Sequence, residues 1–172
     1  MAQGEGASAP TLLDRLLRPG RSSGRDVMLD VVGHHTLSPA LLKFGGRVTA
    51  RPYTNYPAYL GHMAGFDINM VPLLQDRFNA CKSAIRFLDA AMVETVTIAS
   101  RTGDFVNVVE HGKTGLLADG KEAWLPLLRD LVASAGKRRA MGKAARNFAE
   151  TGMSSSHIAA ALDPALVAEF GP

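Results

Sequence analysis

Residues 66–100 read FDINMVPLLQDRFNACKSAIRFLDAAMVETVTIAS. A short apolar run over 68–71 stops at Pro72, and after a polar loop a helical pattern extends over about 79–92. A second run of β-branched residues, 95–98, closes the stretch. Strand, loop, helix and strand in this order make a right-handed parallel crossover. The stretch therefore predicts an α/β fold, a doubly wound parallel sheet flanked by helices.

The loop at 72–79 and the polar side of the following helix are the expected ligand site. Open α/β sheets bind ligands at the carboxyl ends of their strands. Four polar residues at spacings of three, four and three form one stripe on this helix: Asn79, Lys82, Arg86 and Asp89. Lys82 and Ser83 are expected in its first turn, where free N–H groups favour a phosphate or diphosphate. The alternative is a solvated face with a charge cluster, which the pattern alone favours.

Several motifs follow one another along the chain. FDINMVPL at 66–73 precedes FN-x-x-KS-x-x-R-x-L-D at 78–89, a small-residue run ends in IAS at 98–100, and HGKTGLL at 111–117 precedes an Ala-Trp pair. Their order and spacing resemble the C-terminal domain of group 1 glycosyltransferases, which have two Rossmann-like domains in the GT-B architecture. The resemblance covers about 26–150. It implies a Rossmann-like domain that binds a nucleotide-sugar donor.

The resemblance also implies roles for residues of the central helix. Asp89 stands where the family has a glutamate that accepts hydrogen bonds from the ribose hydroxyls of the donor. Lys82 and Ser83 match the Lys-Ser pair beside the diphosphate and sugar. Arg86 matches a second basic position, and Asn79 matches the asparagine of the Phe-Asn pair.

Five further candidates follow other expected strands. Gly33 begins a loop that faces the interdomain cleft in the family. Arg51 and Tyr53 are expected to cover a nucleobase by stacking. Thr102 and Gly103 match a loop that approaches the sugar and diphosphate.

Simpler interpretations stand beside these assignments. The three tyrosines at 53, 56 and 59 are equally explained by packing at the start of a helix. The adjacent histidines at 34 and 35 have the chemistry of metal ligands, but no other ligand cluster accompanies them in the sequence. We therefore expect neither a metal ion nor another cofactor.

The sequence departs from the family pattern in three respects. Glu94 and Val96 replace the glycine and proline of a G-x-P turn after the helix. Cys81 occupies a position where many relatives have a second glutamate, and the ribose carboxylate is Asp89 rather than a glutamate. The departures at Glu94 and Val96, together with the lack of a counterpart to the N-terminal half of the architecture, motivate a second hypothesis, a catalytically silent Rossmann-like module that acts in protein association.

The composition is that of one globular domain. The chain has 172 residues, of which 47% are hydrophobic and 20% charged, with a net charge of +3 and one cysteine. Residues 1–10 are expected to be disordered, and residues 11–172 to form one donor-binding domain. No apolar run has the length of a membrane span, and no signal peptide is recognisable. With a single cysteine, these features predict a cytoplasmic protein.

The remaining elements follow from apolar periodicity. Strands are expected at 27–32 and 47–50, with an edge strand at 116–117. Helices are expected at 11–18, 37–44, 57–64, 105–110, 122–135, 137–150 and 154–170. The helix at 137–150 has a basic outer face, which we interpret as a solvated face because no aromatic residues interleave with its charges. Nucleic acid is therefore not expected as a partner, while peripheral membrane contact stays open.

The family resemblance begins in the middle of the first strand–helix unit of the C-terminal domain. The first strand and a whole N-terminal acceptor domain have no counterpart in the sequence. We therefore expect a donor-binding half that binds a nucleoside diphosphate sugar, takes part in a retaining hexosyl transfer, and is inactive alone. It would need an N-terminal acceptor domain or a partner subunit to complete the catalytic cleft.

Overall fold

A computed structural model describes residues 27–33, 37, 39–154 and 157. The expected disordered segment at 1–10, the helix at 11–18 and nearly all of the helix at 154–170 lie outside the described residues. Within the described ranges, no helix is long and apolar enough to cross a lipid bilayer.

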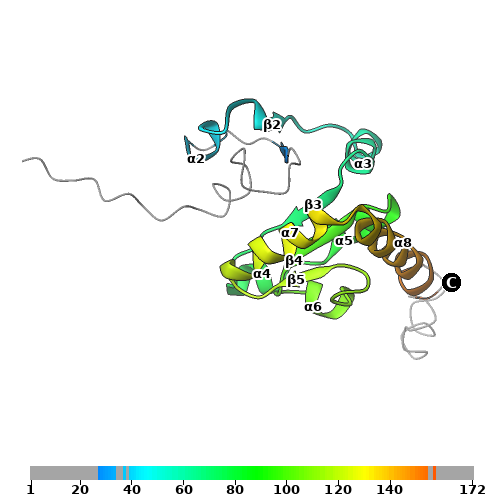
Figure 1. The fold of residues 1–172 in the computed structure, drawn as a ribbon. Coiled ribbons are helices and arrows are strands. Elements are labelled where there is room, and N and C mark those ends of the chain that lie inside the picture. Colours follow the sequence, from blue (N-terminus) through cyan, green and yellow to red (C-terminus); the bar gives the residue numbers. More distant parts are fainter. Residues whose placement is uncertain (1–26, 34–36, 38, 155–156, 158–172) are drawn as a thin grey trace, which may run out of the picture.

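The strands in the described part of the chain run parallel to their hydrogen-bonded neighbours, which confirms the expected α/β class, but they form two sheets (Figure 1). The first sheet pairs β1 (Leu29–Val32) with β2 (Val48–Arg51). The second has the order β3 (Ile68–Val71), β4 (Val96–Ser100) and β5 (Leu116–Ala118). Among these strands, β1 and β3 share no hydrogen-bonded ladder. The parallel sheet is therefore divided where a continuous one was expected.

The other helices lie where the periodicity predicted them, with shifted ends. They are α2 (Pro39–Leu42), α3 (Tyr56–Ala64), α6 (Phe105–Val108), α7 (Trp124–Ala133) and α8 (Ala135–Gly152). A short 3-10 turn at Gly45–Arg47 follows the helix expected at 37–44 and includes Arg47, which was expected to begin a strand. Another at Lys121–Ala123 opens the element expected at 122–135. The helix expected at 105–110 is only one turn long, because Val109 is already extended.

The central helix is not continuous, which corrects the expected span of 79–92. It consists of α4 (Arg77–Ala80) and α5 (Ile85–Met92). In the gap between them, the Lys82 carbonyl accepts a hydrogen bond from the backbone N–H of Asp104 at 3.2 Å. Because this contact comes from the loop after β4, a tertiary interaction breaks a segment whose local pattern is helical.

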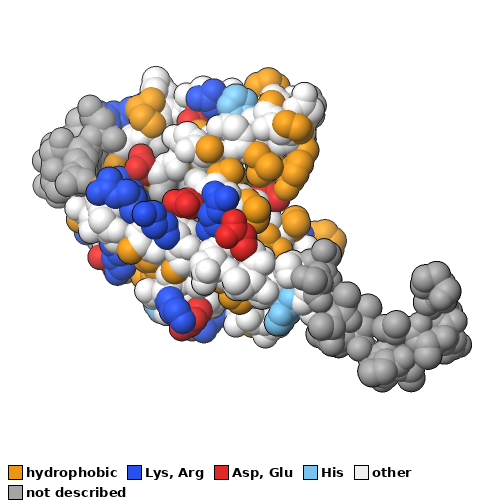
Figure 2. Space-filling view, turned by 90° about the vertical axis from the view of Figure 1, so that its right-hand side faces the viewer, with side chains coloured by type: hydrophobic (Ala, Val, Ile, Leu, Met, Phe, Trp, Pro, Cys, Tyr) orange, Lys and Arg blue, Asp and Glu red, His pale blue; other side chains and the backbone are white. Residues whose placement is uncertain are grey.

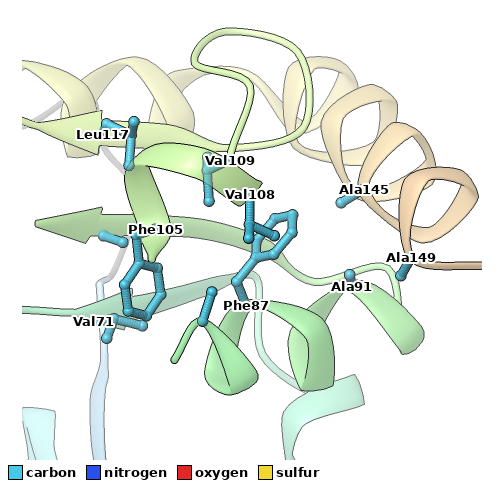
Figure 3. Close-up of a cluster of buried hydrophobic side chains, with 11 residues drawn as sticks. Val71, Phe87, Ala91, Phe105, Val108, Val109, Leu117, Ala145 and Ala149 are labelled. Atoms are coloured by element: carbon cyan, nitrogen blue, oxygen red, sulfur yellow. The ribbon is translucent and has the colours of Figure 1, made fainter. Parts of the chain in front are cut away.

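The second sheet has an apolar cluster on each face. On one face, alternate residues of β4 and β5 pack with α7 and with Met141 of α8. On the other face, Phe87 of α5 lies with Phe105, Ala145 and Ala149 (Figure 3). Every residue of β4 is buried, as expected for a parallel strand covered on both faces.

The first sheet packs against the α7 side of this core. Val48 of β2 belongs to the same buried cluster as Ile98 of β4, and half-buried residues of β1 lie against that cluster. Side chains therefore join the two sheets, although no backbone ladder does so among the described strands.

Helix α8 approaches the turn after α5 very closely. Glu94 lies in this turn with a φ of 59°, a left-handed conformation that glycine favours. A Cβ on Gly142 of α8 would lie 2.0 Å from the Glu94 carbonyl oxygen. Glu94, which replaces the family's glycine, therefore keeps a backbone conformation that suits glycine. As a residue with a side chain, it is strained in that conformation.

We expect Glu94→Gly to stabilise the protein. A non-glycine residue in the left-handed region costs about 1–2 kcal/mol, and the greater freedom of glycine in the unfolded chain offsets about 0.4–1 kcal/mol of the relief. Urea unfolding should show a net gain of about 0.5–1 kcal/mol. Glu94→Ala is the control, because it removes the charge and keeps the strain. An equal gain in both variants would contradict the explanation.

We expect Gly142→Ala to destabilise the protein by about 1–3 kcal/mol, because the added methyl group would overlap the Glu94 carbonyl. Gly136→Ala on the same helix is the matched control, since the nearest atom to its Cβ would be the Ser134 hydroxyl at 4.0 Å. That control should be neutral or stabilising, because alanine has the higher helix propensity. Thermal unfolding measures the difference in melting temperature between the two variants, and equal melting temperatures would contradict the prediction.

Candidate functional site

The loops after β3 and β4 are tied together at the carboxyl ends of these strands. The Ser100 hydroxyl accepts a hydrogen bond from the backbone N–H of Leu73 at 2.9 Å. Gly103 lies against the break between α4 and α5, where a Cβ would be 2.8 Å from the Asn79 carbonyl and 3.0 Å from that of Lys82. Gly103 also has a φ of 59°, a left-handed conformation. Glycine therefore suits this position both because there is no space for a Cβ and because of its backbone conformation. Asn79, Lys82 and Gly103 are therefore neighbours, with Thr102 beside them in the chain.

The side chain of Asn79 supports the loop rather than the expected polar stripe. Asn79 is buried, and its amide donates to both carboxylate oxygens of Asp76 at 2.9 Å. Asp76 also caps α4 by accepting from the Asn79 backbone N–H at 2.7 Å. The stripe predicted on one helix face is therefore wrong, because Asn79 belongs to α4 and is already bonded.

Lys82 and Ser83 lie just before α5, not in its first turn as expected. Both residues are exposed, and the Lys82 ammonium lies 4.8 Å from the centre of the Phe78 ring. The N-cap position of α5 is Ala84, whose side chain makes no capping hydrogen bond. A cation and a hydroxyl thus stand directly before an eight-residue helix whose N-terminus has no side-chain cap.

Asp89 is a buried carboxylate on α5, with only 7% of its surface exposed. Its Oδ1 accepts a hydrogen bond from the Tyr56 hydroxyl at 2.6 Å. Within the part of the chain that the structure describes, no lysine, arginine or histidine forms an ion pair with Asp89. The predicted alternative of a charge cluster that includes Asp89 is therefore not found in these residues.

Two tyrosines of α3 share the environment of Asp89. The hydrogen bond to Asp89 is the largest cause that raises the pKa of the Tyr56 phenol, followed by burial. Burial raises the pKa of Tyr59, and the Asp89 charge adds to this while Arg86 opposes it. The two rings lie 6.2 Å apart, centre to centre. Sequence reasoning assigned Tyr56 only to packing, and no local signal indicated its bond to Asp89.

Arg86 lies one turn before Asp89 on α5 and is exposed. Its carbonyl accepts a hydrogen bond from the side-chain amide of Asn69 on β3 at 3.2 Å. That amide also donates to the Thr97 hydroxyl on β4 at 3.1 Å, so the backbone of α5 is tied to the sheet near Arg86.

The remaining candidates lie at the carboxyl end of the first sheet. The backbone N–H of Gly33 donates to the Arg51 carbonyl at 2.9 Å, and Arg51 Nε lies 3.1 Å from Asp30 Oδ1. Tyr53 is exposed two residues later.

The histidines at 34 and 35 lie outside the described residues. Among the residues that are described, no three or more metal-ligating side chains are grouped, and the expectation of no metal stays a prediction.

The basic face of α8 carries acidic partners. Arg146 lies 2.8 Å from Glu150, Lys137 lies 2.5 Å from Asp130, and Arg138 lies 2.8 Å from Asp67. Figure 2, which views the side of the molecule where α8 lies in Figure 1, shows cationic and acidic side chains next to each other. This mixture of charges supports the interpretation of a solvated face.

The comparisons with known proteins agree with this geometry. A sequence model of the family described as Glycosyl transferase-like matches residues 13–163. The D-inositol 3-phosphate glycosyltransferase of Arthrobacter sp. (strain FB24) is 30% identical over 105 residues, which are 60% of this chain and 24% of that protein.

Two solved structures share the fold. The crystal structure of Anabaena Alr3699/HepE in complex with UDP and glucose matches with a TM-score of 0.62 at 17% identity, covering 81% of this chain and 39% of that one. The C-terminal domain of a group 1 family glycosyl transferase (LpcC) from Francisella tularensis matches with a TM-score of 0.56 at 12% identity, covering 66% and 57%.

This chain thus spans about a quarter of the curated relative's length and 39% of HepE. The match of the family model covers most of the sequence, and the solved neighbours place the fold among GT-B glycosyltransferases. The chain belongs to the Glycosyl transferase-like family.

Proposed function

We propose that this chain is the donor-binding domain of a glycosyltransferase and binds a nucleoside diphosphate sugar, from which a glycosyl group passes to an acceptor. The observation that carries the proposal is the buried Asp89 carboxylate, which holds a hydrogen bond but no ion-pair partner among the described residues.

A buried carboxylate without a cationic partner lowers the stability of the folded state, because burial removes the hydration of the charge. Such groups are candidates for functional sites. A carboxylate accepts hydrogen bonds only and has about four lone-pair positions, which suits a vicinal diol such as that of a ribose. The family assignment supports this role for Asp89, since the position corresponds to the ribose carboxylate of group 1 glycosyltransferases.

The diphosphate would lie against the N-terminus of α5. Lys82 and Ser83 stand directly before that helix, and Gly103 lies within contact distance of the Lys82 carbonyl. Backbone N–H groups at a helix N-terminus and a nearby ammonium both favour an anion. Arg86 is exposed on the first turn of α5 and would add a second positive charge. Positive charge here would also stabilise the diphosphate that develops when the glycosyl bond breaks.

The nucleobase would lie near the carboxyl end of the first sheet. Tyr53 is exposed there, and Arg51 is held in place by its ion pair with Asp30. Gly33 is hydrogen-bonded to the Arg51 backbone in the same region. The UDP and UDP-glucose complexes of HepE, which shares the fold, make UDP the first nucleotide to test.

Glycosyl transfer itself would need regions that the longer relatives have and that this chain does not match. An N-terminal acceptor domain or a partner subunit would supply the acceptor site and close the cleft, and no metal would take part.

The competing hypothesis is a silent module for protein association. Its first motivation, the loss of the glycine at Glu94, is weakened by the retained left-handed φ at this residue. A cytoplasmic location stays part of the proposal.

Asp89→Ala should lower the affinity for UDP by at least about tenfold, because a hydrogen bond to a charged acceptor contributes about 1.5–3 kcal/mol. Isothermal titration calorimetry at low salt measures the change. Asp67→Ala is the matched control, since Asp67 is exposed just before β3, at its opposite end, where it pairs with Arg138. Unchanged affinity in Asp89→Ala, or no binding of UDP, GDP or ADP by the parent, would favour the silent module.

Lys82→Gln should weaken UDP binding and leave uridine binding unchanged, because the lost ammonium would act on the diphosphate only. We expect a loss of about three- to tenfold at low salt, since an exposed charge is worth about 1 kcal/mol and is screened by salt. Titration of both ligands at two salt concentrations checks this. An equal loss for uridine would place Lys82 outside the diphosphate site.

A further inference from the structure

The Tyr56–Asp89 hydrogen bond occupies an oxygen of the carboxylate assigned to the ribose. The Tyr56 hydroxyl lies 2.6 Å from Asp89 Oδ1, a short distance typical of a neutral donor on a charged acceptor. Asp89 is 7% exposed, so a ligand can use its carboxylate fully only if a neighbouring group moves. The bond joins α3 to α5 across 33 positions of the chain.

The two partners differ in how freely they can move. Asp89 lies on α5, whose residues Phe87, Ala90 and Ala91 are fully buried and whose Arg86 backbone is tied to Asn69. Tyr56 is the first residue of α3 and is 59% exposed. The start of α3 is fixed independently, because the Asn55 side chain accepts from the backbone N–H of Ala58 at 3.0 Å. Rotation of the Tyr56 side chain would therefore cost the contact with Tyr59 but no core packing.

We propose that Tyr56 is a specificity-determining residue of this site: its hydroxyl bonds to Asp89 in the empty domain and is displaced by a ligand that presents a vicinal diol. This rests on the proposed function, which assigns Asp89 to a ribose. The exchange of hydrogen bonds gives the selectivity. A diol replaces one hydrogen bond on the carboxylate by two, whereas a single hydroxyl replaces one by one and gains nothing.

The test compares three ligands on two proteins, the parent and Tyr56→Phe. The ligands are UDP, 2′-deoxy-UDP and 2′,3′-dideoxy-UDP, which offer two, one and no ribose hydroxyls. The parent should bind UDP most tightly and the two deoxy ligands about equally. Tyr56→Phe should bind UDP and 2′-deoxy-UDP about tenfold more tightly than the parent does, because no bond to Asp89 has to be broken first. Its affinity for 2′,3′-dideoxy-UDP should be unchanged, so this ligand is the internal control.

A second measurement follows the tyrosine itself. With tyrosine labelled at Cζ, the 13C resonance of Tyr56, assigned from its loss in Tyr56→Phe, should shift on addition of UDP. It should stay in place on addition of 2′,3′-dideoxy-UDP. This readout reports displacement of the hydroxyl, which a purely structural role of Tyr56 would not produce.

The outcomes separate this inference from the proposed function. If Asp89→Ala loses UDP while Tyr56→Phe leaves all three affinities unchanged or lowers them, Tyr56 is not displaced and only the present inference is overturned. If the parent binds none of UDP, GDP and ADP, or if Asp89→Ala binds UDP as the parent does, the proposed function and the role of Tyr56 are both overturned. Equal tightening for all three ligands would also overturn displacement by the diol.

Discussion

The burial of helix α5 between the second sheet and α8 is the constraint on which the other features depend. Phe87, Ala90 and Ala91 are fully buried, and Ala145 and Ala149 of α8 join the same cluster as Phe87. Small residues on α8 allow this close approach. As a result α5 has little freedom to shift, and Asp89 on this helix is held at a fixed position.

This packing requires a strained backbone conformation after α5, and it fixes the position of α5 in the candidate site. The chain leaves α5 through a left-handed residue, Glu94, and passes under Gly142, which has no Cβ to obstruct it. Before the N-terminus of α5, Lys82 and Ser83 lie in a turn that is hydrogen-bonded to the loop after β4. The rigid helix thus carries Asp89 and Arg86, while Lys82, Ser83 and Tyr53, which are also expected to touch a ligand, lie outside the helices and strands.

Local sequence signals predicted the strands better than the site. The strand at 68–71 was predicted to the residue, because an apolar run meets Pro72 and the chain cannot continue the ladder. The break between α4 and α5 was missed, because it is held by Asp104, more than twenty residues away. The contact of Tyr56 with Asp89 was missed for the same reason, since periodicity along one segment says nothing about a partner on another helix.

The division of the strands into two sheets bears on how the domain opens. The first sheet is joined to the second by apolar side chains, without a ladder between β1 and β3. Loss of these side-chain contacts alone would separate the two sheets and leave each ladder intact. The single tryptophan, Trp124, lies in the cluster that joins them. Its fluorescence would therefore report separation of the two sheets even while amide exchange within β4 and β5 remained slow.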